Sequence, residues 1–184
     1  AMVDGLVGSE MCIRDSRGVE ALSNLQAFTK WVPRPIKITK KLVEKNLDIS
    51  RKRMNVDTLD LVQFHWWEYQ NKNYLDALNY MAELQSEGKI KHLALTNFDT
   101  KHLKIIIESG IKIVSNQVQF SLVDRRPLVE MVKFCLKHNI KLLAYGTLCG
   151  GLLSDKYLDF PEIKNINLNT VSSVSYTHLT LPTS

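Results

Sequence analysis

The sequence lacks a long apolar run and has only three cysteines among its 184 residues. No run approaches the roughly 18 apolar residues that a membrane-spanning helix needs, so we expect no membrane partner. The cysteines form neither a redox CxxC pair nor a zinc knuckle, and the five histidines form no group with the spacing of metal ligands. We therefore predict a cytoplasmic protein with no structural disulfide and no bound metal.

Nucleic-acid binding has little support, because aromatic and basic residues are not interleaved and no nucleic-acid motif occurs. Hydrophobic residues make up 45% of the chain and charged residues 23%, which is ordinary for a globular domain. The formal net charge of +5 suits a phosphate-bearing ligand. The densest basic run, Arg51 to Arg53, is interpreted as the solvated end of a helix, where cations are favoured. Nothing in the sequence indicates the oligomeric state.

What the chain does contain is a set of five short apolar runs, each of which leads into a residue with a chemically useful side chain. Runs of this length predict buried strands, and the helix-like stretches between them predict a parallel sheet with helical crossovers. In a barrel built from such units, the active site lies at the C-terminal ends of the strands. We therefore expect the five residues to form one site: Lys30, His65, Asn97, Gln117 and Tyr145.

Four of the crossovers carry helix signals of their own. Thr39 is expected to cap the first helix, and the second is expected over 74–87, ending before Gly88. Thr100 is expected to cap a helix over 101–109. Pro127 is expected to open the last helix, which places Leu136 on its apolar stripe and ends near Asn139.

Each residue of the expected site also has an ordinary structural interpretation. A buried lysine at position 30 can depress the pKa of a neighbouring acid, or its side chain can reach out to water. His65 can donate a hydrogen bond to a substrate carbonyl, or it can be a core histidine beside aromatic residues. Two amides and a ring, at Asn97, Gln117 and Tyr145, match a flat ligand with its own carboxamide, such as nicotinamide. Any one of those three can instead cap a loop.

The chain is short for a closed barrel, since eight strands with their helices typically take about 250 residues. We expect it to be truncated at both ends, and an open sheet of five strands to be marginal or aggregation-prone because it exposes apolar faces and edges. Residues 1–16 and 174–184 show neither helical nor strand periodicity. We expect them to be a non-native or disordered head and tail, with the folded part at 17–173.

Five segments follow one another along the chain: FTKW from Phe28, LDLVQFHW from Leu59, EGKIKHLALTNFD from Glu87, SNQVQFSLVD from Ser115 and AYGTLCGGLL from Ala144. Together they resemble the aldo-keto reductases. The resemblance extends from about Ala21 to Asp159, and it implies a (β/α)8 TIM barrel of which strands three to seven are present. It also implies reduction of aldehydes or ketones with hydride from NADPH, with NAD not excluded.

The same resemblance implies a role for each site residue. Lys30 matches the lysine that lowers the pKa of a catalytic tyrosine, and His65 matches the histidine that orients and polarises the substrate carbonyl. The residues that match the nicotinamide contacts are Thr96 and Asn97 for the carboxamide, Gln117 for the same amide, and Tyr145 for stacking on the ring.

One departure from the family pattern limits the expected activity. The family's tyrosine acid and its aspartate precede the lysine, but no tyrosine occurs in this sequence before Tyr69. General-acid catalysis contributes about 10²- to 10⁴-fold, so the chain alone should reduce carbonyls poorly. Trp31, Trp66 and Phe98 are candidate walls of the substrate pocket, or alternatively core residues.

Two other functions stay open at this point. A cofactor-binding regulatory subunit on the same barrel would keep the amides and Tyr145 but would tolerate loss of Lys30 and His65, both of which are present. A barrel enzyme for phosphorylated sugars would need a glycine-rich phosphate loop, and Gly150 with Gly151 is too little to indicate one.

Overall fold

The computed structural model describes residues 26–34, 37–151, 153 and 155. Within them, five parallel strands pair in the order β1-β2-β3-β4-β5, which confirms the predicted parallel α/β sheet. The expected head and tail lie outside the described residues, so the domain boundaries stay predictions. The strands are β1 (Phe28–Trp31), β2 (Leu59–His65), β3 (Ile90–Thr96), β4 (Ser115–Gln119) and β5 (Lys141–Tyr145).

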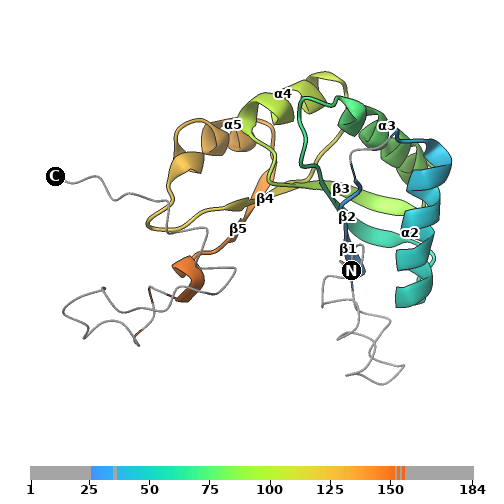
Figure 1. Ribbon diagram of the computed structural model, residues 1–184, viewed down its shortest axis with the longest axis horizontal. Helices are drawn as coiled ribbons and strands as arrows, with labels where there is room; N and C mark the ends of the chain where they lie inside the picture. Colours follow the sequence, from blue (N-terminus) through green and yellow to red (C-terminus); the bar gives the residue numbers. More distant parts are fainter. Residues whose placement is uncertain (1–25, 35–36, 152, 154, 156–184) are drawn as a thin grey trace.

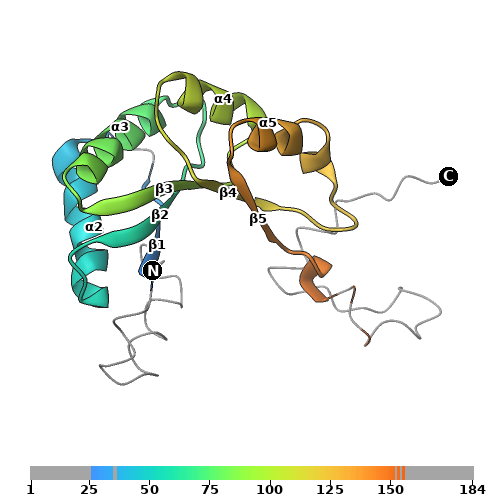
Figure 2. The same ribbon diagram turned by 180° about the vertical axis from the view of Figure 1, so that it is seen from behind.

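The described α-helices all lie along one side of the sheet, as both ribbon views show (Figure 1, Figure 2). This follows from the strand order, because right-handed crossovers that always step to the next strand in the same direction keep their helices on one face. A doubly wound sheet reverses its strand order and carries helices on both faces. The arrangement is therefore that of a barrel wall. Its helices are α2 (Lys40–Met54), α3 (Asn73–Ser86), α4 (Thr100–Glu108) and α5 (Met131–Lys137).

The two faces of the sheet differ in chemistry, because successive side chains of a strand point to opposite faces. On β2, Val62 and Phe64 point to the helices and are fully buried in the hydrophobic core. Gln63 and His65 alternate with them and therefore point to the inner, concave face. Inner-face side chains at the two outermost strands are open to solvent, with 47% of Phe28 and 40% of Leu143 exposed.

Several predicted helix signals are confirmed. The hydroxyl of Thr39 accepts a hydrogen bond from the backbone N–H of Leu42 and caps α2. Gly88, directly after the turn that ends α3, has a φ of 79°, and Asn139 after α5 has a φ of 54°. Both values lie in the left-handed region, which glycine and asparagine adopt more readily than other residues. The backbone conformation of these two residues therefore explains why α3 and α5 end where the sequence predicted.

Other local predictions were wrong. Asp99, not Thr100, caps α4, with its carboxylate accepting from the backbone N–H of His102. Pro127 lies in a short 3-10 helix, η2 (Arg126–Leu128), and α5 begins only at Met131. Leu136 was expected on the apolar stripe of that helix, but 76% of it is exposed.

Gln117 was predicted to follow the end of a strand and instead lies in the middle of β4. The apolar residues that suggested an earlier strand, Ile113 and Val114, precede the ladder. The pairing with β3 starts only where Ser115 lies opposite Ala94. Among the described residues, no helix has the length and apolarity needed to cross a bilayer.

Candidate active site

Three of the expected site residues form one row across the sheet. The register pairs His65 of β2 with Thr96 of β3, and Thr96 with Gln117 of β4. Side chains of directly paired residues point to the same face of a sheet. This row therefore lies on the concave face, at the C-terminal ends of β2 and β3 and at mid-strand in β4.

Lys30 reaches this row from β1. Its Nζ donates a hydrogen bond of 2.7 Å to Oε1 of Gln117. Neighbouring strands are about 4.8 Å apart, so three strand spacings in a flat sheet would separate the two backbones by about 14 Å. The direct bond therefore requires the sheet to curve toward its concave face, as a barrel wall does.

The electrostatics of the row favour a neutral histidine. Burial, and secondly the positive charge of Lys30, lower the pKa of His65 to about 4. Burial also lowers the pKa of Lys30. A neutral imidazole carries one N–H donor and one acceptor nitrogen. Neither nitrogen of His65 has a hydrogen-bond partner within the described part of the chain, so the imidazole is free to bind a ligand.

Asn97 follows β3 and is fixed by three contacts. Its backbone N–H donates to the carbonyl of Gln117 over 2.8 Å, and its side-chain Oδ1 accepts from the hydroxyl of Tyr145 over 2.9 Å. Its own carbonyl accepts from the hydroxyl of Tyr69, also over 2.9 Å. With Oδ1 occupied by Tyr145, the side-chain Nδ2 of Asn97 is left as a donor.

The row also contains a buried hydroxyl that needs a partner. Oγ1 of Thr96 is buried and has no hydrogen-bond partner among the described residues. A buried hydroxyl without a partner costs about 1–3 kcal/mol, and a ligand that bonds to it recovers that cost. Beside the donor of Asn97, this hydroxyl fits a ligand carboxamide, which has both a carbonyl oxygen and an amide N–H₂.

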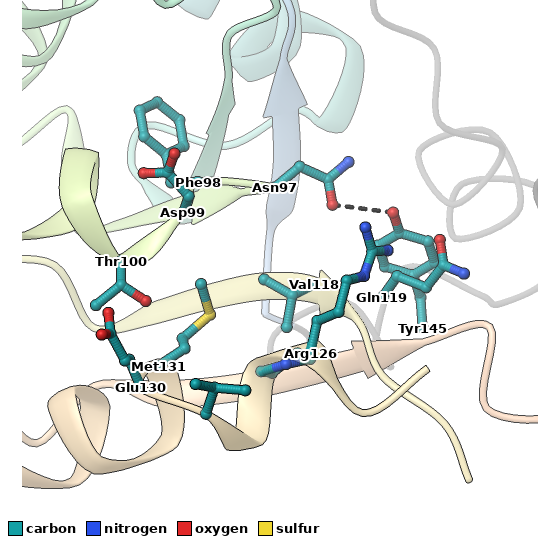
Figure 3. A pocket seen from close by; sticks show the side chains of 12 residues that line it. Asn97, Phe98, Asp99, Thr100, Val118, Gln119, Arg126, Glu130, Met131 and Tyr145 are labelled. Carbon is teal, nitrogen blue, oxygen red and sulfur yellow. Dashed lines mark hydrogen bonds between the residues drawn. The ribbon is translucent and has the colours of Figure 1, made fainter. Parts of the chain in front are cut away.

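A cleft of about 470 Å³ is lined in part by Asn97 and Tyr145, whose hydrogen bond is drawn in Figure 3. Its wall includes Arg126, whose guanidinium donates two hydrogen bonds to the carboxylate of Asp124, of 2.8 and 2.6 Å. The Asp124 side chain is fully buried, whereas 76% of the Arg126 side chain is exposed. These hydrogen bonds from Arg126 hold the pKa of Asp124 below its usual range.

Sequence reasoning did not identify three residues at the site: Tyr69, Trp67 and Arg126. The ring of Trp67 lies 4.3 Å from that of His65 and is 70% exposed, so it forms an open wall beside the histidine. The sequence signal for Trp67 was its position two residues after His65, just past the predicted strand end. The contact of Tyr69 with Asn97 joins segments 28 residues apart, which local sequence patterns do not connect. Arg126 pairs with Asp124 only two residues away, but no pattern in the sequence marks that pair as part of a site.

The three aromatic residues named as candidate pocket walls are instead core residues. Their side chains belong to the hydrophobic cluster between the sheet and the helices, and each is at most 7% exposed: Trp31, Trp66 and Phe98. Phe98 also lies at the edge of the cleft beside Asn97. The core alternative is therefore correct for all three.

The sequence model of the Aldo/keto reductase family matches residues 11–179 of this chain. The uncharacterized oxidoreductase YqkF of Bacillus subtilis is 31% identical over 150 residues, which cover 82% of this chain and 46% of YqkF. An aldo-keto reductase of Mycolicibacterium smegmatis is 36% identical over 110 residues, covering 59% of this chain and 39% of that protein. The chain thus spans less than half the length of these two relatives.

Solved structures show the same fold. An aldo/keto reductase from Klebsiella pneumoniae, in complex with NADP and acetate, superposes with a TM-score of 0.64 and 23% identity. The superposition covers 79% of this chain and 50% of that one. The predicted fold class, part of a (β/α)8 barrel, is thereby confirmed.

Proposed function

The chain belongs to the aldo/keto reductase family, and on that premise we propose that it is part of an NADP-dependent oxidoreductase that reduces aldehydes or ketones to alcohols. The observation that carries the proposal is the row of His65, Thr96 and Gln117, joined by Lys30 on the concave face. The chain spans about half the length of its relatives, so the activity and the carbonyl substrate are proposed for the whole protein.

Four residues are assigned to the nicotinamide of the cofactor. NADPH, when bound, supplies the hydride. The Thr96 hydroxyl and the Asn97 amide would hold the carboxamide, Gln117 would contact the same group, and the ring of Tyr145 would stack on the nicotinamide. The buried unpaired hydroxyl of Thr96 supports this assignment. The NADP in the Klebsiella complex supports NADP over NAD.

We assign His65 to the substrate carbonyl and Lys30 to the acid that protonates it. A neutral His65 would donate its N–H to the carbonyl oxygen and orient it, and its low pKa supports the neutral form at physiological pH. Lys30 would lower the pKa of a tyrosine acid that, in the family pattern, precedes this lysine in sequence. Since no tyrosine precedes Tyr69 here, we propose that this stretch of chain alone has little reductase activity. Its cytoplasmic location stays a prediction from the sequence.

The test is a fluorescence titration of the purified chain with NADPH. We expect saturable binding that NADP⁺ displaces, together with slow or undetectable oxidation of NADPH when an aldehyde is added. Tyr145→Ala removes the ring and should weaken binding about tenfold, whereas Tyr145→Phe keeps the ring and should cost at most about threefold. Absence of NADPH binding by the unaltered chain would contradict the proposed function for this polypeptide.

A further inference from the structure

Asn97 has a strained backbone that its surroundings must maintain. Its φ is 60°, in the left-handed region, which costs an L-residue roughly 1–2 kcal/mol, although asparagine tolerates it better than most. Of its three contacts, those with Gln117 and Tyr145 come from residues already assigned to the cofactor. The third, from the hydroxyl of Tyr69 to the Asn97 carbonyl, comes from a residue with no assigned role.

The ring of Tyr69 is held from several sides. It meets Phe98 edge-on at 5.3 Å between ring centroids and lies 4.4 Å from the ring of His102. His102 is itself fixed, because its Nδ1 lies 2.7 Å from the Asp99 carboxylate that caps α4. These two ring contacts support the orientation in which the hydroxyl lies at the carbonyl of Asn97.

Tyr69 also joins two parts of the barrel wall that are distant in sequence. It lies between β2 and α3, whereas Asn97 and the cap of α4 follow β3, 28 residues later. Burial raises the pKa of Tyr69, so its hydroxyl stays a donor throughout the physiological range. The Tyr69 hydroxyl can therefore donate to the Asn97 carbonyl at any pH in that range.

We propose that Tyr69 is a positioning residue for the nicotinamide cofactor. By holding the Asn97 carbonyl, it keeps that residue left-handed and keeps the Asn97 side-chain Nδ2 directed at the ligand carboxamide. The inference rests on the proposed function, because it concerns the amide group of the same cofactor. Tyr69 does not contact the cofactor in this scheme, and its effect passes through Asn97 alone.

The test compares Tyr69→Phe with the unaltered full-length chain. The substitution keeps the ring contacts with Phe98 and His102 and removes only the hydroxyl. One hydrogen bond is worth about 0.5–1.5 kcal/mol, so the dissociation constant for NADPH should rise about 2- to 12-fold. Tyr74→Phe is the matched control: Tyr74 packs in the same aromatic cluster, but its hydroxyl has no hydrogen-bond partner among the described residues. The dissociation constant of Tyr74→Phe for NADPH should stay within about twofold of that of the unaltered chain.

A second measurement separates positioning from general destabilisation. The NMR carbonyl and amide shifts of Asn97 in the cofactor-free chain should change in Tyr69→Phe and not in Tyr74→Phe. Unchanged Asn97 shifts, or an unchanged dissociation constant when the parent chain binds NADPH, would overturn the role of Tyr69 and leave the proposed function standing. Failure of the parent chain itself to bind NADPH would overturn the proposed function, and the role of Tyr69 with it.

Discussion

Lys30 and Gln117 are hydrogen-bonded over 2.7 Å although two strands lie between theirs. The bond is possible only because the sheet curves, since a flat sheet would hold their backbones about 14 Å apart. Lys30 also lies on the strand next to that of His65, and its positive charge, after burial, lowers the pKa of that histidine. One lysine thus both bridges the curved sheet to Gln117 and contributes to the neutral state of His65.

Replacing Lys30 by methionine should raise the pKa of His65 above about 4. The new value should stay below the ordinary 6.5, because burial is the larger cause of the shift and it remains. An NMR titration of the imidazole resonances measures the change. Lys104→Met, which removes an exposed lysine of α4 far from the row, is the control and should leave the His65 pKa as it was. An unchanged pKa in Lys30→Met would show that the lysine charge does not act on His65.

The stability of the chain should fall as the pH falls from 6.5 to about 4. In the unfolded chain His65 titrates near 6.5, whereas in the folded chain it stays neutral down to about 4. Between these values the unfolded state binds more protons, so the free energy of unfolding decreases with decreasing pH. The loss from this residue is on the order of 3 kcal/mol, fully developed only below the folded pKa.

Urea unfolding at several pH values within this window measures the loss. His65→Gln should reduce the dependence on pH, because the titrating group is gone. His92→Gln, which replaces an exposed histidine on β3, should preserve it. Identical pH dependence in His65→Gln and the parent chain would contradict the buried, neutral state of His65.

The order of strands and helices was predictable because it depends on local patterns. Apolar runs ending at Lys30, His65 and Asn97 predicted the strands, and Thr39 predicted the start of α2. The cap of α4 was assigned one residue too late, since Asp99 and Thr100 are both capping residues and sequence alone does not rank them. The start of β4 depends on pairing with β3, which is a non-local property.

The sequence predicted most residues of the site, but it predicted few of the contacts among them. The alternation of side chains along β2 places Phe64 on the face opposite His65, and continuing it by two residues places Trp66 on the core face with Phe64. The bond from Tyr69 to Asn97 joins segments 28 residues apart, and only the curved, packed wall brings them together. Contacts of that kind depend on tertiary packing and leave no periodic pattern in the sequence.

Replacing Thr96 by valine should separate stability from cofactor binding. Valine removes the buried hydroxyl that has no partner among the described residues, so the free energy of unfolding should stay equal or rise by up to about 1 kcal/mol. Binding of NADPH should weaken about 3- to 10-fold, because one hydrogen bond to the carboxamide is lost. Thr96→Ser keeps the hydroxyl and should keep the affinity. Equal affinities in the valine and serine variants would show that this hydroxyl does not contact the cofactor.

Removing Arg126 should destabilise the chain more than neutralising Asp124, although the two share one ion pair. Arg126→Met leaves the buried carboxylate without the two hydrogen bonds of its cation, which costs about 2–3 kcal/mol. Asp124→Asn leaves an arginine that is 76% exposed and readily hydrated, and it keeps an acceptor oxygen, so about 1 kcal/mol is expected. Urea unfolding at neutral pH measures both, and Arg125→Met, which alters the exposed neighbouring arginine, should change little. The reverse order would mean that the Asp124 carboxylate is hydrated in the folded chain.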